Sequence, residues 1–238
     1  MSHLPIQVHR PLLTVENVNF SYPNQVKVIT GFSDTFFGGK VTALTGPSGC
    51  GKSTLLYLLG LMHRQSSGEI FIDGRPTSSM SDSERAMYRA NKFGFVFQDA
   101  VLDPSRSVLE NVMETSLYRN ESRSRSRLKA YELMEEFGVA SRASHRPGQI
   151  SGGQAQRIAL CRALMADPAF IIADEPTGNL DPNTRNVVLD AFRSRADAGS
   201  CVIIATHDPD VVSRCDRQVF IGERLFENPR FRYEIEPS

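Results

Sequence analysis

The sequence has few cysteines and no excess of either charge. Its four cysteines form no CxxC pair and accompany no histidine motif; they are Cys50, Cys161, Cys201 and Cys215. This distribution favours reduced thiols in a cytosolic protein over a disulfide framework or a zinc site. Lysine plus arginine equals aspartate plus glutamate, at 27 each. That balance argues against a general nucleic-acid binder, so we expect no nucleic-acid partner.

Long apolar runs are also lacking. No stretch reaches the roughly 18 uninterrupted apolar residues of a membrane-spanning helix, and the amino terminus lacks the apolar run of a signal peptide. We therefore expect the chain to act on a membrane only through another protein. The 238 residues suffice for one large α/β domain, or for a domain that carries a sizeable insertion.

Short apolar and alternating stretches predict the strands of an α/β core. Alternation of apolar and polar residues at 12–20 and 68–74 is typical of half-buried strands. Continuous apolar runs at 170–173 and 201–205 are typical of buried parallel strands. Two further short strands are predicted at 40–45 and 93–97.

The middle of the chain changes to helical spacing. Dense apolar residues predict a buried helix at 53–62, and apolar residues at helical intervals predict helices at 109–117 and 127–137. The charged stretch 119–127 fits either a basic contact patch or a solvated helix face or loop.

This order of elements predicts one domain over residues 1–238. We expect residues 1–97 and 166–238 to form its α/β core, and residues 98–165 to form a helical subdomain.

A glycine-rich loop joins the predicted strand 40–45 to the predicted helix 53–62, and it matches the pattern GxxxxGK[ST]. Its glycines let backbone N–H groups turn inward around a phosphate chain, and the helix dipole adds positive potential there. Lys52 would supply charge to the β- and γ-phosphates, and the Ser53 hydroxyl would bind Mg²⁺. The alternative is a glycine-rich turn with an incidental lysine. The predicted nucleotide-binding residues of this segment are Gly46, Pro47, Ser48, Gly49, Cys50, Gly51, Lys52, Ser53 and Thr54.

Acidic residues follow the apolar strand 170–173. Parallel strands end at one edge of a sheet, so Asp174 and Glu175 are expected beside the phosphate loop. Asp174 would hold Mg²⁺ through water, while Glu175 would polarise the attacking water. The same edge receives His207 from the strand 201–205, either to contact the γ-phosphate or to serve the structure alone. Without the phosphate loop, the acidic pair would be interpreted as a solvated strand end.

Cys50 lies inside the phosphate loop, near a helix N-terminus that can lower the pKa of a thiol. Its oxidation would inhibit nucleotide binding. The alternative is an inert small residue.

The segment Ile150-Ser151-Gly152-Gly153-Gln154 resembles the LSGGQ signature of ABC (ATP-binding cassette) ATPases, with isoleucine in place of the usual leucine. The resemblance implies that Ser151, Gly152, Gly153 and Gln154 bind the γ-phosphate of ATP held by an opposite subunit. The same residues also fit a helix N-cap followed by a helix, and the two interpretations are compatible.

Other motifs of the family occur in the expected order. Tyr22 resembles the aromatic residue that stacks on adenine, and Gln98 resembles the glutamine that reaches Mg²⁺ and the attacking water. The run from Gly178 to Asp181 resembles the D-loop, in which Asp181 couples the two sites of a dimer. His207 resembles the switch histidine.

The resemblance extends over residues 13–226 and implies a fold and an activity. The implied fold is α/β: a P-loop NTPase core of mostly parallel sheet, an N-terminal antiparallel β subdomain and a helical insertion. The implied activity is hydrolysis of ATP with Mg²⁺ in a homodimer that sandwiches the nucleotide. The implied partners are integral membrane permease subunits, at the cytoplasmic face of the cell membrane.

The string ADEPTGNLD at 173–181 resembles cassettes of lipoprotein-releasing, macrolide-export and antimicrobial-peptide transport systems, and the cassette of the bacterial division permease. Residues 99–111 follow that group only loosely. The alternatives are the ATPase of a non-transport complex, such as a division mechanotransmission assembly or one acting on nucleic acid or ribosomes, and a nucleotide-gated scaffold with little hydrolysis.

Overall fold

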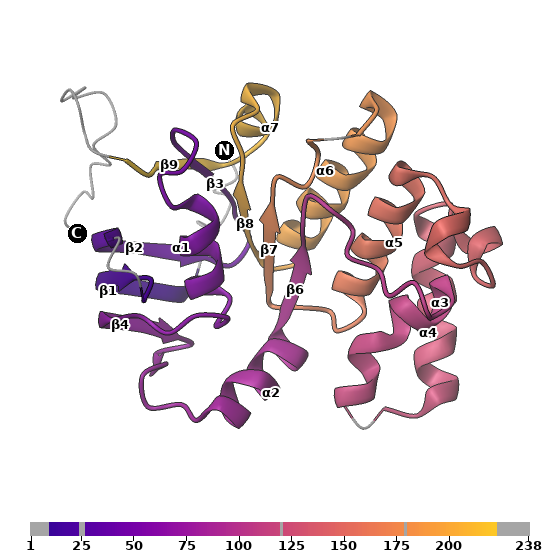
Figure 1. Ribbon diagram of the computed structural model, residues 1–238, viewed down its shortest axis with the longest axis horizontal. Helices are drawn as coiled ribbons and strands as arrows, with labels where there is room; N and C mark the ends of the chain where they lie inside the picture. The colour runs from indigo at the N-terminus through magenta and orange to yellow at the C-terminus, as the bar shows by residue number, and fades with distance from the viewer. Residues whose placement is uncertain (1–9, 24–26, 120, 179, 223–238) are drawn as a thin grey trace, which may run out of the picture.

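The computed structural model describes residues 10–23, 27–119, 121–178 and 180–222. Two β-sheets form its core, and helix α1 (Lys52–Leu59) lies between them (Figure 1). Five of the eight α1 residues are buried, four of them leucines, because both sides of this helix face apolar sheet surfaces. The predicted buried helix is confirmed.

The first sheet is antiparallel and has the strand order β2-β1-β4-β5. Alternation of buried and less buried residues along its central strand explains why the sequence pattern is clear there. Its strands are β1 (Pro11–Ser21), β2 (Lys27–Phe37), β4 (Ser67–Ile72) and β5 (Arg75–Pro76).

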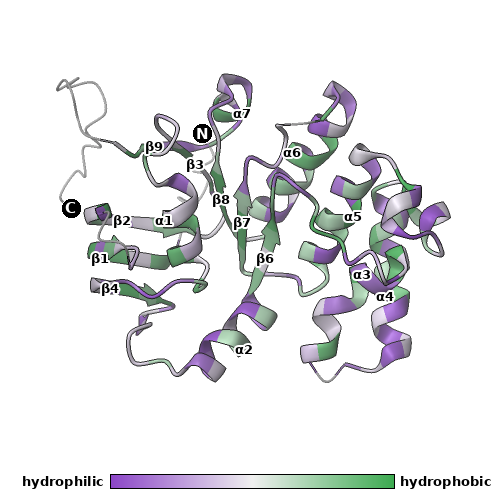
Figure 2. Ribbon diagram, viewed as in Figure 1, coloured by the Kyte–Doolittle hydropathy of each residue, from purple (hydrophilic) through white to green (hydrophobic). Residues whose placement is uncertain are grey.

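The second sheet is parallel and has the order β6-β7-β8-β3-β9. Every residue of β3 and β8 is buried, because α1 covers one face of this sheet and α6 (Pro182–Asp197) covers the other. Figure 2 shows these central strands as strongly hydrophobic. The strands are β6 (Phe93–Val96), β7 (Phe170–Asp174), β8 (Cys201–Ala205), β3 (Val41–Thr45) and β9 (Arg217–Phe220).

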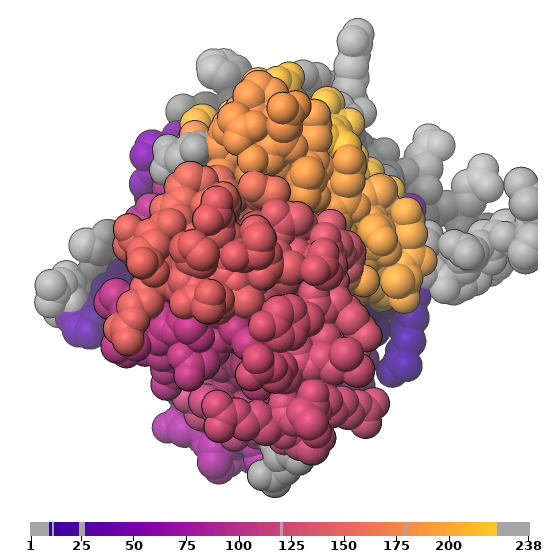
Figure 3. Space-filling view, turned by 90° about the vertical axis from the view of Figure 1, so that its right-hand side faces the viewer, coloured from indigo at the N-terminus to yellow at the C-terminus, as the bar shows by residue number. Residues whose placement is uncertain are grey.

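A helical layer lies beyond β6 and contains α3 (Val108–Val112), α4 (Arg123–Glu136) and α5 (Gly152–Leu164) (Figure 1). Figure 3 shows this layer as one side of the molecule, next to α6. α5 packs against both α3 and β6, so it joins the layer to the parallel sheet. The remaining helices are α2 (Asp82–Lys92), α7 (Pro209–Ser213) and the 3₁₀ turns Met113–Tyr118, Ala140–Arg142 and Pro147–Gln149.

The observed elements confirm the predicted α/β fold class and correct several boundaries. The helix predicted at 53–62 ends at Leu59. The next residue, Gly60, lies so close to Phe95 that an added Cβ would be 2.6 Å from the Phe95 ring. Leu61 then has a left-handed backbone, with φ 60°. The helix predicted at 109–117 is α-helical only to Val112 and continues as a 3₁₀ turn. The division of the chain at residues 98 and 165 stays a prediction.

The charged stretch 119–127 is partly a solvated helix face. Helix α4 begins at Arg123, after Ser122 caps its first turn by accepting a hydrogen bond from the Arg125 amide. Arg123, Arg125 and Arg127 are all exposed. Among the residues that the structure describes, no helix combines the length and apolar character that crossing a membrane requires.

Candidate active site

The predicted site residues gather at one edge of the parallel sheet. The loop after β3, the acidic pair at the end of β7 and the residues after β8 all leave the sheet there. Two contacts fix their alignment: Asp174 lies opposite Ala205 in the β7–β8 ladder, and the Glu175 amide donates to the Ala205 carbonyl at 2.9 Å. The placement expected from parallel strands is therefore confirmed.

The phosphate loop needs glycine at two tight positions. Gly46 has φ 147°, and a Cβ there would lie 2.0 Å from the Ile221 carbonyl oxygen. Gly51 has φ 99°, and a Cβ there would lie 2.8 Å from a methyl group of Val28. Lys52 folds over the loop, where its Nζ donates to the carbonyl oxygens of Gly46 at 2.8 Å and Pro47 at 2.9 Å. The loop thus holds a cation above backbone that only glycine permits.

Asp174 accepts hydrogen bonds from two hydroxyl groups on one face of α1. Its carboxylate accepts from the Ser53 hydroxyl and, at 3.5 Å, from the Tyr57 hydroxyl one helical turn further on. Burial raises the pKa of Asp174, the neighbouring Glu175 charge adds to the rise, and the two hydroxyl groups oppose it. Burial and Asp174 also raise the pKa of Tyr57, which keeps this phenol protonated as a donor.

Glu175 is held by two residues that follow β8. Its Oε1 lies 2.7 Å from His207 Nδ1, and its Oε2 accepts from the Thr206 hydroxyl at 3.3 Å. The Glu175 backbone is left-handed at φ 45°, which is uncommon for a residue with a side chain and typical of functional positions. The His207 side chain is 78% exposed, whereas that of Glu175 is 19% exposed. His207 therefore presents a solvent-facing ring while it orients the carboxylate beneath.

A cavity of about 430 Å³ brings the predicted metal residues together with Glu175. Ser53, Gln98, Asp174 and Glu175 all line it, with Tyr57 and Phe97. Gln98 lies close to the turn after Glu175, since a Cβ on Gly178 would lie 3.5 Å from its Nε2. Hydroxyl, amide and carboxylate groups thus converge on one space next to the phosphate loop.

Tyr22 lies beside the start of α1. Its hydroxyl lies 3.2 Å from the Thr54 hydroxyl, and its ring is 39% exposed. Phe20 and His63 pack edge-on against the ring, with centroid distances of 5.0 Å and 5.9 Å. Thr54 therefore supports Tyr22 and is itself only 7% exposed.

The segment around Ser151 forms a complete capping box. The Ser151 hydroxyl accepts from the Gln154 amide at 3.3 Å, and the Gln154 side chain accepts from the Ser151 amide at 3.0 Å. The N-cap interpretation is confirmed, and Ser151 and Gly152 are exposed at the helix tip. Figure 1 places α5 beyond β6 and β7 from α1, the helix that follows the phosphate loop.

Asp181 lies next to that tip in the same chain. It caps α6 by accepting from the amides of Asn183 at 3.0 Å and Thr184 at 3.1 Å. The Thr184 hydroxyl, together with these two amides, lowers the pKa of Asp181. A Cβ on Gly153 would lie 3.6 Å from an Asp181 carboxylate oxygen. The predicted signature and D-loop residues are therefore neighbours; Asn179, within the predicted D-loop, lies outside the described residues.

Sequence reasoning missed several residues that shape the site. Tyr57 had a usable signal, because it lies four residues after Ser53 on the same helix face. His63 and the buried Gln156 of α5 had none, because their contacts depend on tertiary packing. Thr206 was expected at the sheet edge because it follows β8 directly, but its bond to Glu175 was not predicted. All four cysteines are free, as predicted. Cys50 packs toward Gly46, and any redox role for it stays a prediction.

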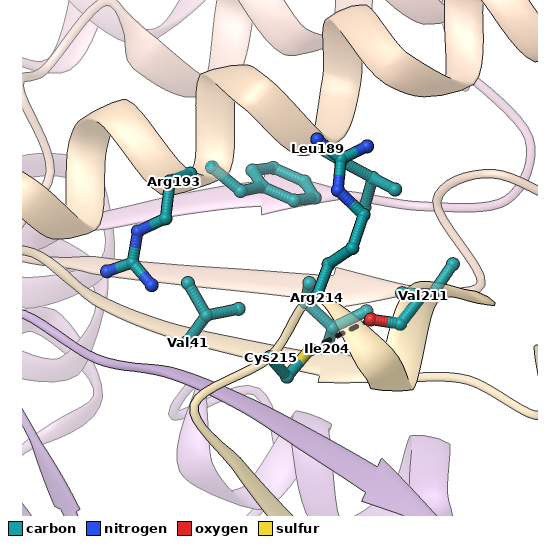
Figure 4. A pocket seen from close by; sticks show the side chains of 8 residues that line it. Val41, Leu189, Arg193, Ile204, Val211, Arg214 and Cys215 are labelled. Atoms are coloured by element: carbon teal, nitrogen blue, oxygen red, sulfur yellow. Dashed lines mark hydrogen bonds between the residues drawn. The ribbon is translucent and has the colours of Figure 1, made fainter. Parts of the chain in front are cut away.

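A second cavity, of about 260 Å³, lies under α6, on the face of the parallel sheet opposite to α1 (Figure 4). Its two arginines are engaged. Arg193 pairs with Asp197 and Asp216, and Arg214 pairs with Asp190. None of the predicted site residues lines this cavity.

Comparison with known proteins agrees with this geometry. Residues 29–178 match the family described as ABC transporter. The chain belongs to the ABC transporter family. This membership confirms the predicted P-loop fold and the predicted activity, that of an ATP-hydrolysing, nucleotide-binding subunit of a membrane ABC transporter.

Among similar proteins of the ABC transporter family is the lipoprotein-releasing system ATP-binding protein LolD of Paramagnetospirillum magneticum. It is 41% identical over 217 residues, which cover 90% of this chain and 96% of the relative. An uncharacterised ABC transporter ATP-binding protein of Thermotoga maritima is 43% identical over 188 residues, covering 79% of this chain and 80% of the relative. The predicted resemblance to lipoprotein-releasing cassettes is thus confirmed.

Solved structures of the family are similar as well. The dimeric structure of MJ0796, described as a bacterial ABC transporter cassette, has a TM-score of 0.83 and 32% identity, covering 88% of this chain and 94% of that chain. A dimeric post-hydrolysis state of the same cassette, bound to ADP and Pi, has a TM-score of 0.81 and 31% identity, with the same coverage.

Proposed function

We propose that this ABC ATPase works as a homodimer that traps ATP and Mg²⁺ between two chains and powers a permease at the cytoplasmic face of the membrane. The observation that carries the proposal is the cavity in which Ser53, Gln98, Asp174 and Glu175 converge next to the phosphate loop. Within one chain, α5 lies beyond β6 and β7 from α1, and we infer that a second copy brings its Ser151 to this site.

The donor set at the cavity fits Mg²⁺. Ser53, Gln98 and Asp174 supply hydroxyl, amide and carboxylate oxygens, the ligand type that this ion prefers, and Asp174 would bind through water. Bound Mg²⁺ would neutralise negative charge on the β- and γ-phosphate oxygens. The Ser53 hydroxyl, which now donates to Asp174, would turn to the ion, and Tyr57 would remain to hold the carboxylate.

The hydrolytic step assigns separate tasks to the remaining residues. Glu175 accepts a proton from the attacking water, while His207 and Thr206 keep its carboxylate in position. Lys52 exchanges its two carbonyl partners for phosphate oxygens. Gly153 and Ser151 of the second chain complete the donors around the charge that develops in the transition state. Asp181, beside Gly153, couples closure of one site to the other.

Glu175→Gln tests the hydrolytic assignment. We expect turnover to fall at least about 10²-fold, the scale for loss of a general base, with ATP affinity unchanged. Glu132→Gln, an exposed carboxylate of α4, is the matched control and should leave turnover unchanged. Normal ATP hydrolysis by Glu175→Gln would contradict the assignment.

Lipoprotein is the proposed cargo class, because relatives that carry this function cover most of the chain. The test is affinity capture of the tagged chain from detergent-solubilised membranes of the native cell. We expect a multi-span permease whose reconstituted complex releases a lipoprotein from proteoliposomes only with ATP. Capture of a division permease, or release of peptides but no lipoprotein, would overturn the cargo assignment while leaving the ATPase proposal intact.

A further inference from the structure

Gln156 joins the two segments that carry the catalytic side chains. It lies on α5 and is 3% exposed. Its Nε2 donates to the Phe97 carbonyl at 2.9 Å and to the Pro176 carbonyl at 3.1 Å. Phe97 immediately precedes Gln98, and Pro176 immediately follows Glu175. One buried amide therefore uses both of its N–H donors on the backbone beside two site residues.

The two hydrogen bonds of Gln156 lie beyond the ends of strands β6 and β7, where the sheet ladder no longer fixes the backbone. The β6–β7 ladder ends at the pair Val96–Ala173, one residue before Phe97 and three before Pro176. Glu175 is left-handed, a conformation that persists only where its surroundings impose it. The Glu175 amide is fixed by Ala205 on one side. On the other side, Gln156 fixes the carbonyl of Pro176, the residue after Glu175. The direction of the Glu175 side chain therefore depends on the contacts made by Ala205 and Gln156.

The same helix holds the other end of the Gln98 segment. Arg162 donates to the carbonyl oxygens of Ala100 at 2.9 Å and Val101 at 2.8 Å, and its side chain is 13% exposed. Gln98 thus lies between two attachment points on α5. Ser151, at the tip of this helix, lies only about 7.5 Å from Gln156 along the helix axis.

We propose that Gln156 is a positioning residue for ATP hydrolysis that acts in its own chain. It holds Gln98 and Glu175 at a fixed separation and ties both to the helix whose tip meets the nucleotide of the opposite site. The inference rests on the proposed dimeric function. Methionine has a similar length but cannot replace this amide, because the backbone carbonyls of Phe97 and Pro176 would lose their donor.

Gln156→Met is the first test. We expect kcat to fall about 10- to 100-fold, the scale for misplacing a catalytic group by about 1 Å. The affinity for ATP should change less than about 2-fold, because Tyr22 and the phosphate loop keep their contacts. The matched control is Gln65→Met, which removes an amide that donates to Glu69 and should leave kcat unchanged. Full kcat in Gln156→Met would overturn the proposal.

Mixed dimers separate a positioning role from general support of the α5 tip. In the first mixture, one chain carries Gln156→Met and the other Glu175→Gln, so the remaining competent site has the altered Gln156 beside its own Glu175. In the second, a wild-type chain pairs with a chain carrying both substitutions, so the altered Gln156 lies only on the helix contributed across the interface. Differently tagged chains and tandem purification isolate each mixture.

We expect the first mixture to lose activity about 10-fold or more relative to a wild-type/Glu175→Gln dimer, and the second to keep it. Loss confined to the second mixture, or equal loss in both, would overturn the proposal. If Gln156→Met does not fold, Gln156→Asn serves in its place, since it keeps the amide but is one methylene too short to reach both carbonyls. A wild-type chain that neither dimerises nor hydrolyses ATP would instead contradict the proposed function.

Discussion

The phosphate loop and the segment around Ser151 are both glycine-rich starts of helices, but their surroundings differ. The phosphate loop lies at the edge of the parallel sheet, where Lys52 folds over the loop and Asp174 and Glu175 of the same chain line the neighbouring cavity. Ser151 and Gly152 lie exposed at the N-terminus of α5, a helix that lies beyond β6 and β7 from α1. One helix start is surrounded by catalytic groups of its own chain, whereas the other is presented outward.

Under the proposed function, this difference lets one chain bind ATP and requires a second chain for its hydrolysis. Residues near the phosphate loop should affect nucleotide binding in the monomer. Residues at the α5 tip should affect only steps that require the dimer. Substitutions at the two helix starts therefore separate the two functions.

Lys52→Ala should have the largest effect on binding. Lys52 bonds two backbone carbonyls that it would exchange for phosphate oxygens, and hydrogen bonds to charged groups contribute about 1.5–3 kcal/mol each. We expect the Kd for ATP to rise about 10²-fold or more, measured by calorimetry on the isolated chain. An unchanged Kd would contradict the assignment of the phosphate loop.

Ser151→Ala should lower hydrolysis about 10- to 100-fold, the scale for losing one bond to a charged phosphate, with the monomer Kd for ATP unchanged. The matched control is Ser81→Ala, because Ser81 and Glu84 form the same capping box at the start of α2. Each substitution should cost about 1 kcal/mol of helix stability. Equal loss of ATPase activity in both variants would reduce the role of Ser151 to capping.

Tyr22→Ala should weaken ATP binding on the order of 10-fold, because base–aromatic stacking contributes about 1–3 kcal/mol per base. Tyr22→Phe keeps the ring and loses only the contact to Thr54, so its affinity should stay within about 2-fold of wild type. Fluorescence titration with an ATP analogue measures both. Equal affinities for the two variants would show that the ring does not stack on the base.

Cys50 should give the smallest effect. Its thiol packs against Gly46 in the loop and makes no hydrogen bond among the contacts of the described residues. We expect Cys50→Ser to keep kcat within about 2-fold, and its activity to respond to thiol alkylation no differently from wild type. Alkylation that inhibits the wild-type chain and spares Cys50→Ser would contradict this and show that the Cys50 thiol is reactive and that its modification blocks the loop.

The strands that deliver the site could be predicted because β7 and β8 are buried on both faces and therefore continuously apolar. β2 could not, since its irregular pairing with β1 leaves an uneven burial pattern. The edge of the sheet followed from topology, so Asp174 and Glu175 were found. His207 was expected at the same edge, but its contact with Glu175 and the bridge made by Gln156 were not predicted, because these contacts join residues 20 to 59 positions apart.

The most direct test of a nucleotide-trapping dimer is the mass in solution of Glu175→Gln, measured by light scattering with ATP, with ADP and without nucleotide. We predict a dimer with ATP alone, and a monomer with ATP when Ser151→Arg is added to place a bulky cation at the α5 tip. A Glu175→Gln chain that binds ATP yet stays monomeric, even with its permease supplied, would contradict the account.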